Sequence, residues 1–136
     1  MAPCYHLDAN IVLRFRRSDD ARQSPASAKL FARAKSGQVR LAISAVTVAE
    51  IFCVLARVYK HTRVAAAARL IPLIQSNVLE AEHRKRILDA LKRVTQANVD
   101  FGDAYLAATA VEQGAQVASF DTDLQAFPDL TTLVPL

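Results

Sequence analysis

The sequence predicts an α/β fold in which a central parallel sheet of four to five strands is flanked by helices. The chain has 136 residues, a length that suits a single compact domain. Apolar residues make up 52% of it and charged residues 22%, which is enough apolar side chain to bury a core. Short apolar runs alternate with helical segments of ten or more residues, as in parallel sheets covered on both faces. We therefore expect one domain over 1–136.

The expected elements follow from apolar periodicity and from residues that start or stop helices. The predicted strands are 4–8, 39–43, a short strand near 78–79, 116–119 and a last one near 133–134. The predicted helices are 10–17, one from Ser24-Pro25 to Gly37, one from Ser44 to about Tyr59, then 63–75, 83–96 and 103–113, the last ending at Gly114.

Composition also excludes several classes of protein. The apolar content argues against a disordered chain, and no run of about 18 uncharged apolar residues predicts a membrane span. No export leader is recognisable, so we expect a cytoplasmic protein. Cys4 and Cys53 lie in apolar runs without metal-ligand spacing and are expected to be buried, reduced thiols.

Charge is distributed unevenly. The formal net charge is +4, and between Arg14 and Arg69 there are twelve Lys or Arg but only three acids. Such a basic surface favours polyanions such as nucleic acid, although ordinary solubility would explain it as well. If it binds a nucleic-acid backbone, we expect Arg14, Arg16 and Arg17 to take part, unless they only form a solvated helix face.

Several acids fall where a parallel sheet places its ligand site. Asp8 closes a predicted strand and Asp121 follows another. Asp103 opens a predicted helix, and Glu50 lies about two turns into the helix after the second strand. The carboxyl ends of parallel strands and the starts of the following helices converge at one edge of the sheet. These acids could therefore meet in one cleft.

Each acid also has a structural explanation. Asp8, Asp100 and Asp103 could cap helices, and Asp121 and Asp123 could form Asx-type turns. Glu50 is harder to explain in this way. Its neighbours along the helix are apolar and no basic residue lies within six positions, so we expect a buried carboxylate that needs a partner.

A carboxylate cluster without basic partners favours a bound cation. Oxygen ligands without histidine favour Mg²⁺, with Mn²⁺ possible in its place, over Zn²⁺. The three histidines show no metal-ligand spacing and are expected to be ordinary strand or surface residues: His6, His61 and His83. An acidic metal site beside a basic surface is typical of metal-dependent nucleases.

Four motifs in order resemble the PIN-domain ribonucleases, and most of all the VapC-type toxins of bacterial toxin–antitoxin pairs. The motifs are LDANIVLRF, AVTVAEIF, DFGDAYLAATA and ASFDTDL, and together they cover nearly the whole chain. The resemblance implies a Mg²⁺-dependent endoribonuclease whose metal ligands are Asp8, Glu50, Asp103 and Asp121. It also implies a helper hydroxyl at Ser119 and a polar residue at Asn10.

The chain departs from the family pattern at a few positions. Ala9 stands where the family often has a hydroxyl residue, and the resemblance fixes no role for Asp100 or Asp123. For Ser119 the structural alternative is a strand-end hydroxyl bonded to nearby backbone. The number of metal ions and the RNA that is cut stay open.

The resemblance further implies RNA as the substrate and a homodimer bound by a small VapB-type antitoxin, with a toxin–antitoxin hetero-oligomer as the alternative assembly. An antitoxin arginine could enter the acidic cleft. The apolar helix faces of 46–58 and 64–74 offer surface for a second copy or a partner helix, or simply cover the sheet.

Two other functions stay open at this point. A PIN-like module could bind RNA through its basic face without cleaving it. The Asp8 motif also resembles the phosphatases of the haloacid-dehalogenase type, whose first Asp is a nucleophile. Against that family, Asn10 replaces a second Asp and no Lys follows Lys92.

Overall fold

The computed structural model describes residues 1–17 and 23–136. Along the chain its elements are β1 (Cys4–His6), α1 (Ala9–Arg17), α2 (Gln23–Lys35), β2 (Arg40–Ile43), α3 (Ala45–Arg57), α4 (Arg63–Gln75), β3 (Leu79–Ala81), α5 (Arg84–Arg93), α6 (Phe101–Gln113), β4 (Val117–Ala118), the 3₁₀ turn η1 (Thr122–Ala126) and β5 (Thr132–Leu133). This alternation confirms the α/β class.

In the part of the chain that the structure describes, all strand pairs are parallel, as predicted, but the five strands form two sheets rather than one. The first sheet has the order β1-β2-β3, with Tyr5 beside Leu41 and Leu41 beside Leu79. The second contains β4 and β5, with Ala118 beside Leu133. Leu41 and Leu79 are buried in the core, whereas every residue of β1 is exposed.

Helix boundaries follow capping residues, of which Ser44, Gly37 and Gly114 were predicted from the sequence and Thr62 was not. Ser44 and Thr62 are N-caps of α3 and α4, and each side chain accepts a hydrogen bond from the first turn. Gly37 and Gly114 follow α2 and α6 with φ of +84° and +66°. In that left-handed region a glycine avoids the strain that a Cβ would introduce.

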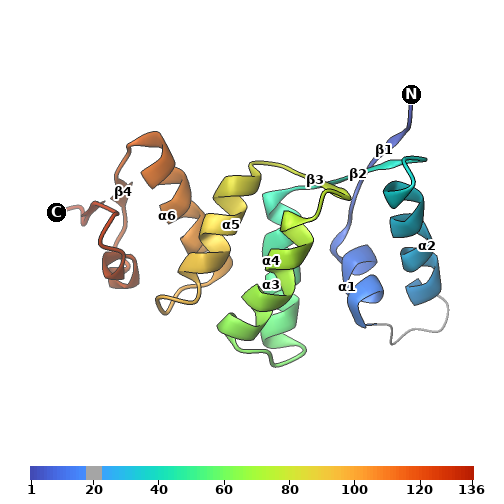
Figure 1. Ribbon diagram of the computed structural model, residues 1–136. Helices are drawn as coiled ribbons and strands as arrows, with labels where there is room; N and C mark the ends of the chain where they lie inside the picture. The colour runs from blue at the N-terminus through green and yellow to red at the C-terminus, as the bar shows by residue number, and fades with distance from the viewer. Residues whose placement is uncertain (18–22) are drawn as a thin grey trace.

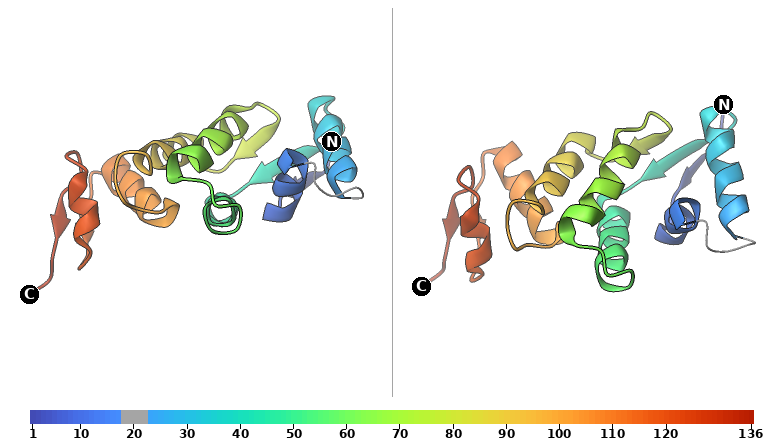
Figure 2. Two further views of the ribbon diagram at one scale, coloured as in Figure 1. Left: turned by 90° about the horizontal axis from the view of Figure 1, so that it is seen from below. Right: turned by 60° about the horizontal axis from the view of Figure 1, so that its bottom comes forward.

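The elements are laid out almost in sequence order along an elongated molecule (Figures 1 and 2). All three views place the β1-β2-β3 sheet with α1 and α2 at one end and β4, η1 and β5 at the other. Helices α3 to α6 lie between these two ends. None of the described helices is long and apolar enough to cross a membrane.

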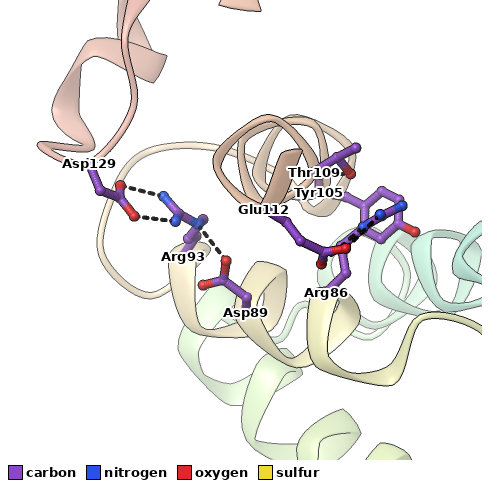
Figure 3. Close-up of polar contacts among 7 residues, drawn as sticks. All are labelled: Arg86, Asp89, Arg93, Tyr105, Thr109, Glu112 and Asp129. Atoms are coloured by element: carbon purple, nitrogen blue, oxygen red, sulfur yellow. Dashed lines mark hydrogen bonds and ion pairs between the residues drawn. The ribbon is translucent and has the colours of Figure 1, made fainter. Parts of the chain in front are cut away.

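Arg93 fixes the C-terminal end of the molecule to α5 (Figure 3). Its guanidinium donates to both carboxylate oxygens of Asp129, at 2.9 and 2.5 Å, and to Asp89 at 3.3 Å. Its Cζ lies 5.0 Å from the ring centroid of Phe127. Arg93 is only 5% exposed, so water solvates its charge poorly. The two carboxylates and the Phe127 ring therefore have to stabilise that charge in place of water.

The prediction for the two cysteines is half right. Both thiols are free, as expected, but both are exposed rather than buried. Cys4 lies on the exposed strand β1. Cys53 lies on the side of α3 opposite the buried residues Ile51 and Leu55.

Candidate active site

Asp8 and Glu50 lie on separate elements of the N-terminal half. Asp8 lies between β1 and α1, two residues after the end of the strand. Its backbone carbonyl accepts a hydrogen bond from Ile11 N–H in the first turn of α1. Glu50 lies in the middle of α3, and both side chains are exposed. The expected burial of Glu50 is therefore wrong, because it lies on the solvent side of α3 together with Val46 and Cys53.

Asp103 lies in the first turn of α6, at the positive end of that helix. Asp100 is the N-cap, and its Oδ1 accepts a hydrogen bond from Asp103 N–H at 3.1 Å. The structural explanation considered for Asp100 is thus correct. The same bond holds the backbone of Asp103, which leaves the Asp103 carboxylate free of a capping role.

Ser119 and Asp121 form two successive hydrogen-bonded turns after β4. Asp121 N–H donates to Ser119 Oγ at 2.9 Å, and Asp121 Oδ1 accepts from Asp123 N–H at 2.9 Å. The Ser119 hydroxyl is therefore bonded to nearby backbone, as the structural explanation for this residue expected. It shapes the turn that carries Asp121, so any effect on the site would be indirect.

The carboxylates of the C-terminal half act on one another. Burial raises the pKa of the Asp103 carboxyl above its usual range. The negative charges of Asp100, Asp121 and Asp123 raise that pKa further, in this order of importance. Asp103 thus lies at the centre of a region of negative potential, where a cation would be stabilised.

A cleft of about 660 Å³ opens between α3 and the start of α6. Its lining includes the acids Asp100, Asp103 and Asp123. It also includes basic or titratable residues from the end of α3 to the start of α4, namely Arg57, His61 and Arg63. The cleft therefore contains both acidic and basic side chains, a combination that suits a ligand carrying phosphates and an associated cation.

His61 and Arg63 were not singled out in the sequence as cleft residues. Nδ1 of His61 is buried and has no hydrogen-bond partner among the described residues. Arg63 donates to Asn98 Oδ1 at 2.8 Å, which ties the start of α4 to the loop before α6. The sequence did not indicate that these residues line a cleft, because the cleft depends on how α3 and α6 pack.

The structure brings only part of the predicted site together. Asp103 and Asp121 interact electrostatically, and Asp100 and Asp123 join them. In the described part of the chain, no three His, Cys, Asp or Glu side chains are placed to hold one ion together. The acids around Asp103 fit Mg²⁺ in the chemistry of their donor atoms, since all are hard oxygen ligands. The full ligand set of Asp8, Glu50, Asp103 and Asp121 stays a prediction.

Comparison with known families identifies the fold. The family model described as the PIN domain matches residues 5–130. The chain belongs to the PIN domain family. Among solved structures, it is similar to the crystal structure of VapC20 from Mycobacterium tuberculosis, a toxin described as cleaving the sarcin–ricin loop. The identity is 24% over 96% of this chain and 99% of that chain, with a TM-score of 0.41. A search of curated proteins found no match.

Proposed function

We propose that this PIN domain is a Mg²⁺-dependent endoribonuclease and acts as the toxin of a VapBC-type toxin–antitoxin pair. Membership of the PIN family over 5–130 carries the proposal. The carboxylates around Asp103 and the mixed charge of the cleft support it. The family match also removes the phosphatase alternative, which requires a different fold.

In the proposed reaction, Asp103 and Asp121 would hold the metal together with Asp8 and Glu50. Bound Mg²⁺ would lower the pKa of a water molecule and neutralise charge on the scissile phosphate. Asp100 would keep Asp103 in place through the N-cap hydrogen bond. The fit of this donor set to Mg²⁺ is one of chemistry, because carboxylate oxygens are the ligands that this ion prefers.

The basic residues of the cleft would bind the RNA backbone. Arg57 and Arg63 line the same cleft as Asp103, so a phosphate that they bind would lie in the cleft of this proposed metal ligand. Arg14 belongs to α1, outside this cleft, and stays a predicted backbone contact. The side chains of Arg16 and Arg17 lie outside the described part of the structure.

An antitoxin of the VapB type, whose arginine could bind bidentately among the acids, would control this activity. We expect a cytoplasmic homodimer that associates with the antitoxin. Co-expression with the small gene adjacent to this one should rescue growth of a host poisoned by the chain. A chain that is harmless when expressed alone would contradict the toxin role, even if it cleaves RNA.

The catalytic proposal is tested with Asp8→Asn and Asp103→Asn, using Glu82→Gln as the matched control. Glu82 is an exposed acid in the turn after β3 and does not line the cleft. We expect both Asp variants to lose Mg²⁺-dependent RNA cleavage while the control retains it. Full activity of either purified Asp variant would contradict the assigned ligands. RNA binding without cleavage by the wild type would favour the non-catalytic module.

A further inference from the structure

Strands β1 and β4 each have an edge without a backbone partner among the described residues. Arg40 N–H donates to Pro3 O and Leu7 N–H to Ala42 O, so alternate residues of β1 bond to β2. The N–H and C=O groups of the residues between them, Cys4 and His6, therefore point to the other edge.

The same alternation applies to β4. Val117 N–H donates to Thr131 O and Ser119 N–H donates to Leu133 O, so both residues bond toward β5. The N–H and C=O of Ala118 then point away from β5, to an edge that no other strand covers in the described structure. A two-stranded sheet of this size is of marginal stability alone, and an open strand edge readily accepts another strand.

The two open edges are complementary in one register. If Ala118 lies beside Tyr5, Ala118 N–H can donate to Cys4 O and His6 N–H can donate to Ala118 O. The result is a parallel pair, like every other pair in this fold. Asp8 follows Tyr5 by three residues and Asp121 follows Ala118 by three, so this register places the two acids at the same edge of the sheet.

Within one chain, β1 and β4 lie at opposite ends of the molecule with α3 to α6 between them (Figures 1 and 2). The salt bridge from Arg93 to Asp129 and the packing of α5 on α6 hold the C-terminal sheet in that position. β4 could reach β1 of the same chain only if this packing were disrupted. A second copy can present its β4 without such a change.

The exposed area also favours a second copy. The chain exposes 8030 Å², whereas a compact protein of 14.9 kDa exposes about 7000 Å². The excess of about 1000 Å² is close to the roughly 800 Å² that each partner buries in a stable interface. Large apolar side chains are exposed on or next to the strands of both sheets, among them Tyr5 on β1, Phe120 after β4 and Leu133 on β5.

We propose that two copies of this chain exchange their C-terminal sheets, so that β4 of each pairs with β1 of the other, with Ala118 beside Tyr5. Each active site is then shared: one copy supplies Asp8 and the other supplies Asp103 and Asp121. The shared site rests on the proposed nuclease function, whereas the strand pairing does not.

Disulfide cross-linking tests the pairing without using activity. In the proposed register His6 lies beside Ser119, and neighbouring strands about 4.8 Å apart are within disulfide range. The native thiols are removed by Cys4→Ser and Cys53→Ser, and chains carrying His6→Cys or Ser119→Cys are co-expressed with different tags. We expect oxidation to give a covalent dimer of the two tagged chains, and no dimer from either chain expressed alone.

The double variant His6→Cys/Ser119→Cys on one chain separates the alternatives. A covalent dimer from this variant supports exchange. A cross-linked monomer would show that the edges pair within one chain, and the absence of any cross-link would show that they do not pair in this register. Either of the last two results overturns the proposal, whether or not the protein cleaves RNA.

Complementation tests the shared site. Co-expressed Asp8→Asn and Asp121→Asn chains should recover about one quarter of the wild-type rate, because half of randomly formed dimers are mixed and each mixed dimer has one intact site of two. If the co-expressed variants are inactive although the cysteine variants cross-link as dimers, the strand exchange stands and the shared active site is wrong. Inactive wild-type protein that cross-links would instead reject the proposed function.

A change at the open edge gives an independent measurement. Ala118→Pro removes the one N–H that β4 offers to β1, while the bonds from Val117 and Ser119 to β5 stay intact. We expect sedimentation to show a monomer for this variant and a dimer for the matched control Ala118→Ser. A dimer of Ala118→Pro with unchanged affinity would contradict pairing through this edge.

Discussion

Loss of the Asp129 carboxylate should destabilise the protein by about 2 kcal/mol. Asp89, 3.3 Å away, would then be the remaining ion-pair partner of Arg93, whose side chain is 6% exposed and poorly reached by water. Hydrogen bonds to a charged group contribute roughly 1.5–3 kcal/mol, and a poorly solvated charge that loses its partner costs at least as much. We therefore expect Asp129→Ala to lower the free energy of unfolding by about 2 kcal/mol.

The converse substitution should cost less, which makes a double-mutant cycle informative. In Arg93→Met, Asp129 has a half-exposed side chain that water can solvate, and the methionine can still pack on Phe127. We expect a loss under about 1 kcal/mol, and almost no further loss when Asp129→Ala is added. Urea unfolding at one fixed protein concentration gives the free energy of unfolding of the wild type, the two single variants and the double variant.

The pH dependence gives a second measurement of the same contact. The hydrogen bonds from Arg93 hold the pKa of Asp129 below its usual range. Because the pKa of Asp129 is lower in the folded protein than in the unfolded chain, its ionised carboxylate stabilises the fold at any pH above the unfolded-state pKa of about 3.9. This contribution is lost as the pH falls through the folded-state pKa. The difference in free energy of unfolding between wild type and Asp129→Ala should therefore disappear below about pH 4. Equal stability of the two proteins at pH 7 would refute the reasoning.

Two further predictions concern α6. Gly114→Ala should cost about 1 kcal/mol because its φ is +66°, whereas Gly102→Ala should be neutral or stabilising, since its Cβ would meet Asp100 Oδ1 at an ordinary 3.6 Å. Thermal unfolding checks the pair, and equal effects would contradict the assigned strain. Asp100→Asn should keep the N-cap but lower the pKa of Asp103, whereas Asp100→Ala should also cost about 1 kcal/mol of stability. Carbon-detected NMR titration of Asp103 without metal measures the shift, and an unchanged pKa in Asp100→Asn would exclude the charge interaction.

The helices were predictable because their boundaries are set by local chemistry. Ser44 ends one strand and caps the next helix, and Gly114 takes the left-handed conformation that stops α6. Such signals act within a few residues and are visible in sequence. Strand β1 was predicted to reach Asp8 but ends at His6, because the chain turns into α1 immediately afterwards.

The wrong predictions concern the burial of side chains and the number of sheets, which depend on how the elements pack. Cys53 and Glu50 lie in an apolar segment, yet α3 turns both toward solvent because one side of the helix is enough to cover the core. The acids at strand ends were expected to meet in one cleft. That expectation assumed a single sheet, whereas the described strands form two, with Asp8 after β1 of one sheet and Asp121 after β4 of the other. The charge of Asp121 acts on Asp103, and the meeting of all four acids stays a prediction.

The near-sequential layout of the elements has a consequence for how the protein folds. Helices that contact mainly their neighbours in sequence close short loops, and chains with such local contacts fold fast. The helical middle of each chain should therefore form before any contact between copies. Association is slower and depends on concentration, so two bare strand edges persist for a time after synthesis. During that interval the greatest risk to the protein is a wrong partner at those edges. Refolding at low concentration, followed by gradual concentration, should therefore yield more soluble protein than rapid refolding at high concentration.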